Sequence, residues 1–198
     1  MTATPDFAVR VGGLHTIRAD LEAFRPTHLI GILDPAVPEA VARLGVAPER
    51  ELLILRFRDT AHTEPGGPAV THVEAILSFL DRAIARCGEA EVRLFVHCHA
   101  GVSRSTATAY LALVRKHGVE QAEAAFAELL RVTTKPWPNL SMVAHADQIL
   151  GGGGRLLKPL ETYRARHPNR PHAHGRLHRL RMRRDPGYVA AVRMAAGE

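Results

Sequence analysis

The chain is poor in cysteine and aromatic residues, and it contains no long hydrophobic run. Its 198 residues include two cysteines, Cys87 and Cys98, so at most one disulfide can form. Small secreted domains depend on several disulfides, so this cysteine content favours a reducing, cytoplasmic location. The apolar run in AYLALVRKHG is interrupted by charge well before the roughly 20 residues of a membrane span. The first residues, MTATPDFAVRV, lack a basic segment followed by an apolar one, so we expect neither a transmembrane segment nor a secretory signal.

The overall composition is that of an ordinary globular protein. Hydrophobic residues make up 46% of the chain and charged residues 23%. A chain of this length can bury a substantial core, and it suits one compact domain with a tail.

The net charge of +6 is unevenly distributed along the chain. Residues 155–198 hold eleven Lys and Arg against three acidic residues, a balance of +8, whereas residues 1–154 hold 15 basic and 17 acidic residues, a balance of −2. Glycines fill positions 151–154 and form a plausible joint. We therefore predict a domain over 1–154 and a basic C-terminal extension over 155–198, partly helical or disordered.

The basic extension suits an anionic partner, which would be a nucleic acid, a membrane surface or an acidic protein. Its most basic stretch, RLHRLRMRR, has no interleaved aromatic residues to stack on bases, so a specific nucleic-acid role is weakly supported. A solvated extension with no partner is the simpler interpretation.

The hydrophobic pattern alternates between two periods in the first hundred residues. Short apolar and branched runs indicate buried strands, and segments with apolar residues at spacings of three and four indicate helices. This alternation predicts an α/β fold with a central, mainly parallel sheet flanked by helices and with a helical C-terminal half. The expected strands are 7–13 at an edge, 27–34, 51–57 and 92–98; the expected helices are 15–24, 39–44, 70–85, 105–117, 120–132 and 140–150.

The segment VHCHAGVSRST, residues 96–106, carries the most chemical information. It lies where a predicted buried strand ends and a helix begins, so backbone N–H groups and the helix dipole can converge on one anion. Gly101 lets the backbone approach that anion closely, and the planar Arg104 guanidinium can bind two of its oxygens. The segment therefore predicts a site for a tetrahedral oxyanion such as phosphate. The expected phosphate-binding residues are His99, Ala100, Gly101, Val102, Ser103 and Arg104.

Cys98 lies at the base of this predicted loop, where surrounding positive charge favours the nucleophilic thiolate. In-line attack on a bound phosphoryl group would give a cysteinyl-phosphate, and this route requires no metal or cofactor. Ser105 is placed to hydrogen-bond the sulfur as it departs in the second step. His97 is placed to orient the loop. An inert, buried cysteine at a strand end is the alternative, and it does not explain the other residues of the motif.

These residues resemble the signature of the cysteine-dependent protein phosphatases, which is HC, five residues, R and then S or T. The AG-x-SRS ending is most similar to the compact dual-specificity branch. The resemblance implies a central sheet flanked by helices, and hydrolysis of phosphomonoesters in phosphoproteins, on phosphotyrosine and also on phosphoserine or phosphothreonine. It also implies a general acid, usually an Asp on a loop that precedes the nucleophile strand.

Asp59 is the expected general acid, because it follows the predicted strand 51–57 and begins a loop rich in proline and glycine. It precedes Cys98 by 39 residues, a separation somewhat longer than is usual in the family. Glu64 is the second choice for the acid. Asp34, before a proline, is interpreted as a turn or helix-start residue. The KPWPNL stretch that contains Asn139 is similar to segments in bacterial dual-specificity-like phosphatases, or it only starts the next helix.

Other functions share parts of this pattern. The same loop could serve a phosphoinositide phosphatase or a nucleotide or RNA 5′-phosphatase, although residues 99–103 contain no Lys or Arg to bind a highly charged head group. A non-catalytic phosphoprotein-binding module would be expected if Cys98 or Arg104 were replaced, and both are present. A sulfurtransferase also places a cysteine loop before a helix, but it needs no acid such as Asp59.

Overall fold

The computed structural model describes residues 7–37, 50–60, 65–86 and 91–171, together with Ala190 and Arg193. The predicted helix 39–44 lies outside the described residues, as do Glu64 and Cys87. Most of the predicted basic extension after residue 171 also lies outside them.

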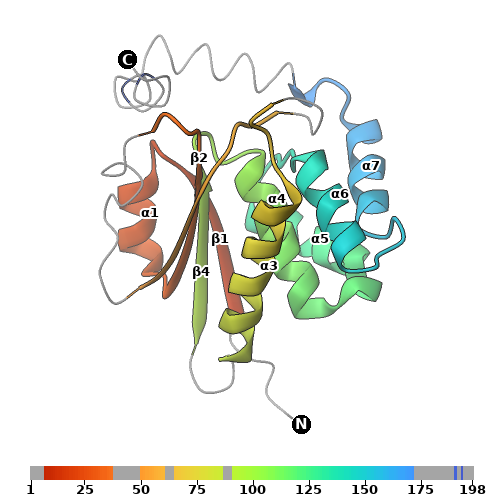
Figure 1. Cartoon of the computed structure of the whole chain (residues 1–198), viewed down its shortest axis with the longest axis horizontal. Coiled ribbons are helices and arrows are strands. Elements are labelled where there is room, and N and C mark those ends of the chain that lie inside the picture. The colour runs from red at the N-terminus through yellow and green to blue at the C-terminus, as the bar shows by residue number, and fades with distance from the viewer. Residues whose placement is uncertain are drawn as a thin grey trace.

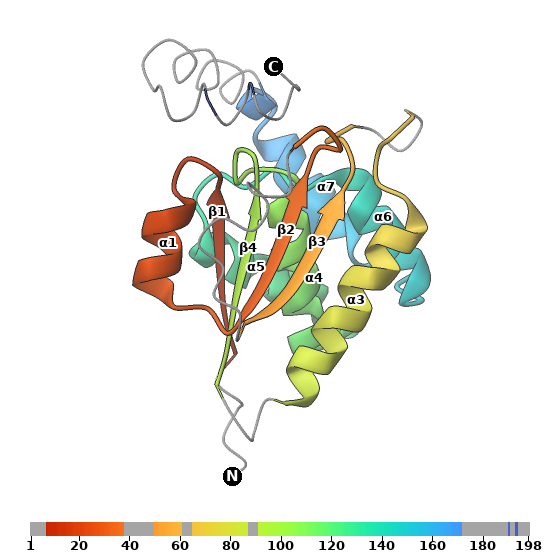
Figure 2. The ribbon, with the colours of Figure 1, turned by 60° about the vertical axis from the view of Figure 1, so that its left-hand side comes forward.

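The centre of the fold is a four-stranded sheet with the order β1-β4-β2-β3 (Figure 2). The strands are β1 (Phe7–Gly13), β2 (His28–Leu33), β3 (Glu51–Arg56) and β4 (Val92–Cys98). All three pairings are parallel. The predicted parallel α/β sheet is confirmed, and β1 lies at an edge as its weak pattern indicated. The apolar runs of β2 and β4 suit central strands, because both faces of a parallel sheet are covered.

Helices cover the two faces of the sheet unequally (Figure 1). Helix α1 (Ile17–Phe24) lies on one face, where its Ile17 and Leu21 pack with Leu29 and Phe95 from the sheet. The other helices of the described ranges lie on the opposite face. No helix in the described ranges is long and apolar enough to cross a membrane. The helices of the opposite face are α3 (Val70–Ala85), α4 (Arg104–His117), α5 (Ala122–Val132), α6 (Leu140–Ile149) and α7 (Leu157–Arg166), with a short 3₁₀ helix η1 (Val119–Gln121) between α4 and α5.

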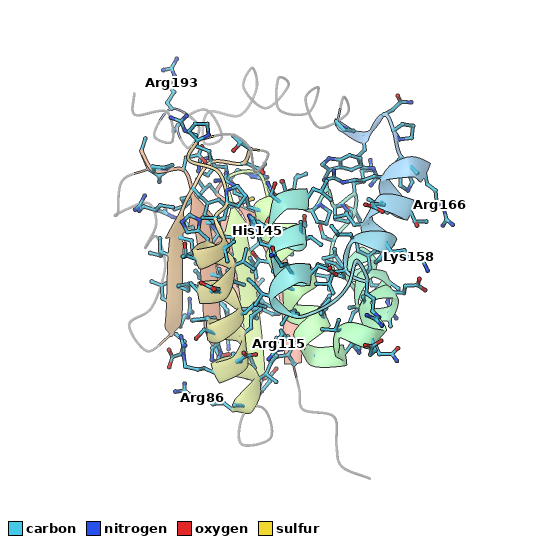
Figure 3. All side chains as sticks on the ribbon, turned by 45° about the vertical axis from the view of Figure 1, so that its right-hand side comes forward. Arg86, Arg115, His145, Lys158, Arg166 and Arg193 are labelled. Atoms are coloured by element: carbon cyan, nitrogen blue, oxygen red, sulfur yellow. The ribbon has the colours of Figure 1, made fainter. Side chains whose placement is uncertain are left out.

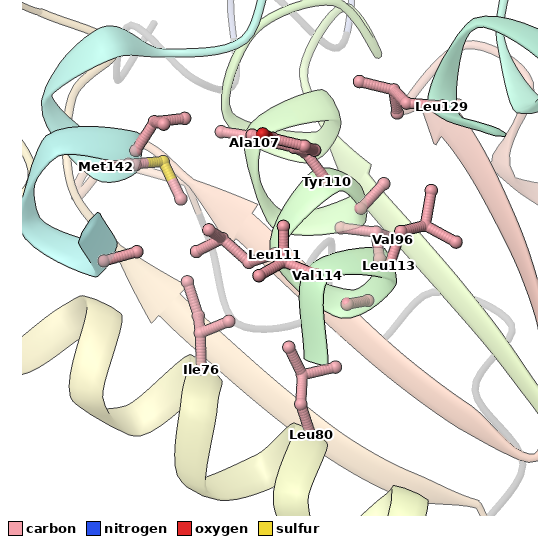
Figure 4. Packing of buried hydrophobic residues seen from close by; sticks show 14 of the residues in the cluster. Ile76, Leu80, Val96, Ala107, Tyr110, Leu111, Leu113, Val114, Leu129 and Met142 are labelled. Carbon is pink, nitrogen blue, oxygen red and sulfur yellow. The ribbon is translucent and has the colours of Figure 1, made fainter. Parts of the chain in front are cut away.

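Helix α4 is the central helix of this layer, and every residue from 104 to 114 is buried. Its Leu111 and Val114 pack against Ile76 and Leu80 of α3 in the main core (Figure 4). A helix buried on all sides is fixed by its neighbours, so its N-terminus, which follows β4 directly, has a well-defined position.

Helix α7 lies beyond the predicted domain boundary, yet it packs against α5 and α6 (Figure 1). Leu156, Leu160 and Tyr163 are buried in the same core as α4. The glycine segment before α7 is also held in place by hydrogen bonds. The Asp147 carboxylate accepts them from the backbone N–H groups of Gly154 (2.6 Å) and Leu156 (2.9 Å). The first part of the segment predicted as an extension therefore shares the core of residues 7–149.

Several basic side chains of α7 and its flanks contact other groups of the fold. Arg155 pairs with Glu120, and Lys158 lies 3.8 Å from Glu123. Arg164 and Arg170 contact groups in the 135–139 segment and on Tyr163. These contacts remove part of the charge that the sequence offers to an anionic partner.

Candidate active site

The site forms at the carboxyl edge of the sheet, where a parallel α/β fold places its ligands. Strand β4 ends at Cys98 and helix α4 begins at Arg104. The residues between them, 99–103, form a turn that we call the cradle loop. Strands β2 and β3 end at the same edge, so the side chains that follow them, Asp34 and Asp59, also reach this site.

Two backbone carbonyls of the cradle loop accept hydrogen bonds from residues outside the loop. The carbonyl of His99 accepts a hydrogen bond from the N–H of Leu14 (3.0 Å), and that of Val102 accepts one from the N–H of Trp137 (2.9 Å). Within the described ranges, the N–H groups of residues 100–104 have no hydrogen-bond acceptor. Several unpaired N–H groups at the N-terminus of a buried helix form a site for an anion.

Gly101 adopts a backbone conformation that only glycine takes without strain, with φ at +72°. A Cβ atom at this position would lie 2.8 Å from the backbone carbonyl of Gly12. The turn therefore depends on the absence of a side chain at position 101, as the sequence predicts.

The sulfur of Cys98 lies at the base of this turn, and the residue is only 1% exposed. Its Sγ is 3.2 Å from Oγ of Ser105, which lies in the first turn of α4. This contact orients the sulfur toward the helix N-terminus, and the Ser105 hydroxyl can stabilise negative charge on it. Cys98 is a free cysteine.

The guanidinium of Arg104 is buried, and one of its terminal nitrogens donates to two acceptors. Its Nη1 donates to Oδ1 of Asp34 (2.6 Å) and to the carbonyl of Phe57 (2.6 Å). Its Nε is buried without a hydrogen-bond partner among the described residues, and it lies 3.8 Å from Oδ2 of Asp59. An unpaired buried donor is costly unless it has a ligand, so the free edge of Arg104 also indicates an anion.

Asp59 accepts two hydrogen bonds on the same carboxylate oxygen, one from the cradle loop and one from Asn139. Ser103 Oγ donates to Oδ1 (2.6 Å), and the side-chain amide of Asn139 donates to it through Nδ2 (2.9 Å). The Asp59 side chain is 34% exposed, so it lies at the mouth of the site, between solvent and the free edge of Arg104. The Asp59 carboxyl group therefore lies within reach of both the cradle loop and Arg104.

Asn139 connects three parts of the site. Its backbone N–H donates to the carbonyl of Ser103 (3.3 Å), and its side-chain amide donates to Asp59. Its Oδ1 accepts from the N–H of Met142 (3.2 Å) and so caps helix α6. Asn139 starts helix α6, as one interpretation of the KPWPNL stretch predicts, and it also contacts Asp59.

Two histidines of the motif are held neutral by their surroundings. Burial, together with the nearby His99, lowers the pKa of His97 from 6.5 to about 4. The His97 ring fills the space over Gly31, where a Cβ would lie 2.7 Å from its Nε2. Burial, followed by the charge of Arg104, also lowers the pKa of His99, although Asp34 and Asp59 oppose this shift. His99 Nε2 accepts a hydrogen bond from the N–H of Asp34 (3.2 Å).

The structure brings Cys98, Arg104, Ser105 and Asp59 together at one edge of the sheet. The pairing of Asp34 with Arg104 was not predicted. The signal was available, because Asp34 directly follows the buried strand β2, but the neighbouring Pro35 suggested a turn. Glu64 lies outside the described residues. In the described part of the chain, no group of three or more His, Cys, Asp or Glu side chains could hold a metal ion.

Comparisons with known proteins agree on the fold. No family model and no curated protein matches the sequence. Among solved structures, the chain is similar to Cydia pomonella PTP-2 phosphatase, with 22% identity and a TM-score of 0.55 over 70% of this chain and 83% of that one. It is similar to DUSP15, with 18% identity and a TM-score of 0.54 over 81% and 95% of the two chains. It is also similar to PTPMT1 in complex with PI(5)P, with 16% identity and a TM-score of 0.51 over 76% and 94%. The chain therefore shares the fold of the dual-specificity and tyrosine phosphatases.

Proposed function

We propose that this protein is a phosphomonoester hydrolase that acts through a cysteinyl-phosphate, and that its substrates are phosphoproteins carrying phosphotyrosine, phosphoserine or phosphothreonine. One arrangement carries the proposal. The Cys98 sulfur lies beside the Ser105 hydroxyl, under a turn whose N–H groups have no acceptor among the described residues. The buried Nε of Arg104 has no hydrogen-bond partner among these residues and lies 3.8 Å from Oδ2 of Asp59. These groups suit the three equatorial oxygens of a phosphoryl group in transfer.

In the first step, the Cys98 thiolate attacks phosphorus and the bond between phosphorus and the ester oxygen breaks. Asp59, in its protonated form, gives its proton to the departing oxygen, so the product leaves as an alcohol or phenol. The cradle loop and Arg104 hold the transferring group and stabilise its charge throughout.

In the second step, a water molecule attacks the phosphorus of the cysteinyl-phosphate, and the bond between phosphorus and sulfur breaks. Asp59, now ionised, takes a proton from that water, which returns the acid to its starting form. The sulfur leaves as a thiolate, and Ser105 donates a hydrogen bond to it. Inorganic phosphate is the second product.

The charges near the site favour substrates with a single phosphate group. Residues 99–103 carry no Lys or Arg, and the carboxylates of Asp34 and Asp59 lie beside the loop. Additional phosphates on an inositol head group would meet these carboxylates, which disfavours the phosphoinositide alternative. A phosphoprotein presents one phosphate at a time. A thiolate nucleophile also requires a reducing compartment, which supports a cytoplasmic location.

The test is hydrolysis of p-nitrophenyl phosphate in the presence of a chelator, followed by competition between phosphotyrosine and phosphothreonine peptides. We expect turnover by the wild-type chain, none by Cys98→Ser, and a strong loss for Arg104→Ala. A wild-type chain that binds phosphopeptides and releases no phosphate would be a binding module. Equal turnover by Cys98→Ser and the wild type would refute the cysteine mechanism.

A further inference from the structure

The segment of residues 135–139 has little internal support for its conformation. Pro136 and Pro138 have no N–H group to donate, and Lys135 adopts a left-handed conformation with φ at +60°. The segment lies between α5 and α6 and forms neither a helix nor a strand. Its conformation must therefore be set by contacts with other parts of the chain.

Two residues of the segment, Trp137 and Asn139, contact the active site. The N–H of Trp137 donates to the carbonyl of Val102 in the cradle loop (2.9 Å). The side-chain amide of Asn139 donates to Asp59 (2.9 Å) and to the carbonyl of Thr60 (3.3 Å). A shift of this segment would therefore move the carboxyl group of Asp59 relative to the cradle loop.

A further set of contacts comes from α7, on the other side of the segment. Nη2 of Arg164 donates to the carbonyl of Pro138 (2.7 Å), and the Arg164 guanidinium lies 4.7 Å from the centre of the Trp137 ring. Burial lowers the pKa of Arg164, and its Nε is enclosed without a hydrogen-bond partner in the described part of the chain. Burying this cation is costly, and the ring face and the carbonyl are what offset that cost.

Helix α7 is itself firmly placed. Leu160 is fully buried, and the Tyr163 ring lies 5.4 Å from that of Phe126 in α5 and 6.5 Å from that of Trp137. A rigid helix therefore presents Arg164 to the carbonyl of Pro138, whereas Lys158 and Arg166 on the same helix extend into solvent (Figure 3).

We propose that Arg164 is a positioning residue for the general acid: through residues 137–139 it holds the carboxyl group of Asp59 at the mouth of the cradle loop. This inference rests on the proposed role of Asp59. It assigns a catalytic consequence to a residue that lies beyond the predicted domain boundary and touches neither the substrate nor the sulfur.

The experiment compares Arg164→Met and Arg164→Lys with Arg166→Met, a matched control on the exposed side of α7. Arg164→Met keeps an unbranched apolar stem and removes the guanidinium with its charge, and Arg164→Lys keeps the charge and removes the planar fork. Turnover is measured with phenyl phosphate, whose leaving group needs a proton, and with p-nitrophenyl phosphate, whose leaving group needs little. Thermal unfolding of each variant is measured in parallel.

We expect Arg164→Met to lower kcat/KM for phenyl phosphate about tenfold and to change kcat/KM for p-nitrophenyl phosphate by less than about twofold. This quantity reports the first step, the transfer of the phosphoryl group to Cys98, in which only a poor leaving group depends on the proton of Asp59. Arg164→Lys should fall between the wild type and Arg164→Met, and Arg166→Met should match the wild type. In an Asp59→Asn background, Arg164→Met should have no further effect on kcat/KM.

An equal loss with both substrates, or an effect that persists in the Asp59→Asn background, would overturn the inference and leave Arg164 as a structural residue. Asp59→Asn separates the two proposals. If it shows the dependence on the leaving group and Arg164→Met does not, the inference fails while the proposed function stands. If Asp59→Asn shows no such dependence, the assignment of the acid fails, and with it the basis of the inference.

Discussion

Asp34 accepts a 2.6 Å hydrogen bond from Nη1 of Arg104, so the arginine that would bind phosphate is already oriented by a carboxylate. The carbonyl of Phe57 accepts from the same nitrogen. One edge of the guanidinium is thereby occupied, and Nε is directed to the site.

Asp34 should therefore support phosphate binding through Arg104. We expect Asp34→Ala to lower kcat/KM for p-nitrophenyl phosphate about tenfold, because a charge-assisted hydrogen bond that fixes a buried side chain is lost. Asp34→Asn, which can still accept a hydrogen bond, should retain most of the activity. Full activity in Asp34→Ala would mean that Phe57 alone holds Arg104.

Removal of the acid should depend on the leaving group. We expect Asp59→Ala to lower kcat/KM for phenyl phosphate by about a hundredfold or more, within the range of general acid catalysis, and to lower kcat/KM for p-nitrophenyl phosphate much less. The control is Asp81→Ala, which removes an exposed carboxylate that pairs with Arg115 on the helical side of the fold. A uniform loss across a series of aryl phosphates would place the acid elsewhere.

Gly101 should be intolerant of even a methyl group. A Cβ would meet the backbone of Gly12 at 2.8 Å in a residue with φ at +72°. We expect Gly101→Ala to cost about 1–3 kcal/mol of stability and to lower kcat/KM at least about tenfold, because the loop must shift. Gly118, at the other end of α4, has φ at +92° and open space around its missing Cβ. Gly118→Ala should therefore lose some stability while keeping its activity, and similar kinetics for the two variants would contradict this account.

The buried His97 should make folding sensitive to acid. Its pKa falls from 6.5 to about 4 in the folded protein, so the unfolded chain binds a proton more readily than the folded one between these values. The contribution of His97 to stability is complete above about pH 6.5, and it is lost progressively as the pH falls toward 4. The loss reaches about 3 kcal/mol at the lower end. Urea unfolding of the wild type and of His97→Gln across this range measures it. The slope should be shallower in the variant, and parallel curves would rule out His97 as its source.

The strand and the helix on either side of residues 99–103 could be predicted from the sequence, because the residue patterns that indicate them lie within each segment. The expected strand 92–98 and helix 105–117 are observed as β4 (Val92–Cys98) and α4 (Arg104–His117). Continuous apolar runs mark buried strands, and the motif itself places the turn between them. The contact of Asp59 with Ser103 agrees with its expected place near the loop, in spite of the long separation along the chain.

The contacts that the sequence did not reveal are those between distant elements. Asp34 reaches Arg104 because β2 lies next to β4, and four similar apolar runs do not specify the order of strands in a sheet. Arg164 lies 26 residues from Pro138, in a segment whose basic composition indicated an exposed extension. Its partners are the face of the Trp137 ring and the carbonyl of Pro138. Both are uncharged, so no pattern of opposite charges in the sequence indicates the contact.

The burial of α7 sets a limit on how far the chain can be shortened. Leu156 and Leu160 are fully buried, and the Leu156 carbonyl accepts a hydrogen bond from the Tyr110 hydroxyl (3.1 Å) at the centre of α4. A truncation at the glycines would remove the Tyr163 ring from Phe126 and would leave the Tyr110 hydroxyl with only the carbonyl of Ala122 (3.3 Å) as an acceptor, and the product would be prone to aggregate. Fragments for crystallisation or assay therefore need to include helix α7, which ends at Arg166.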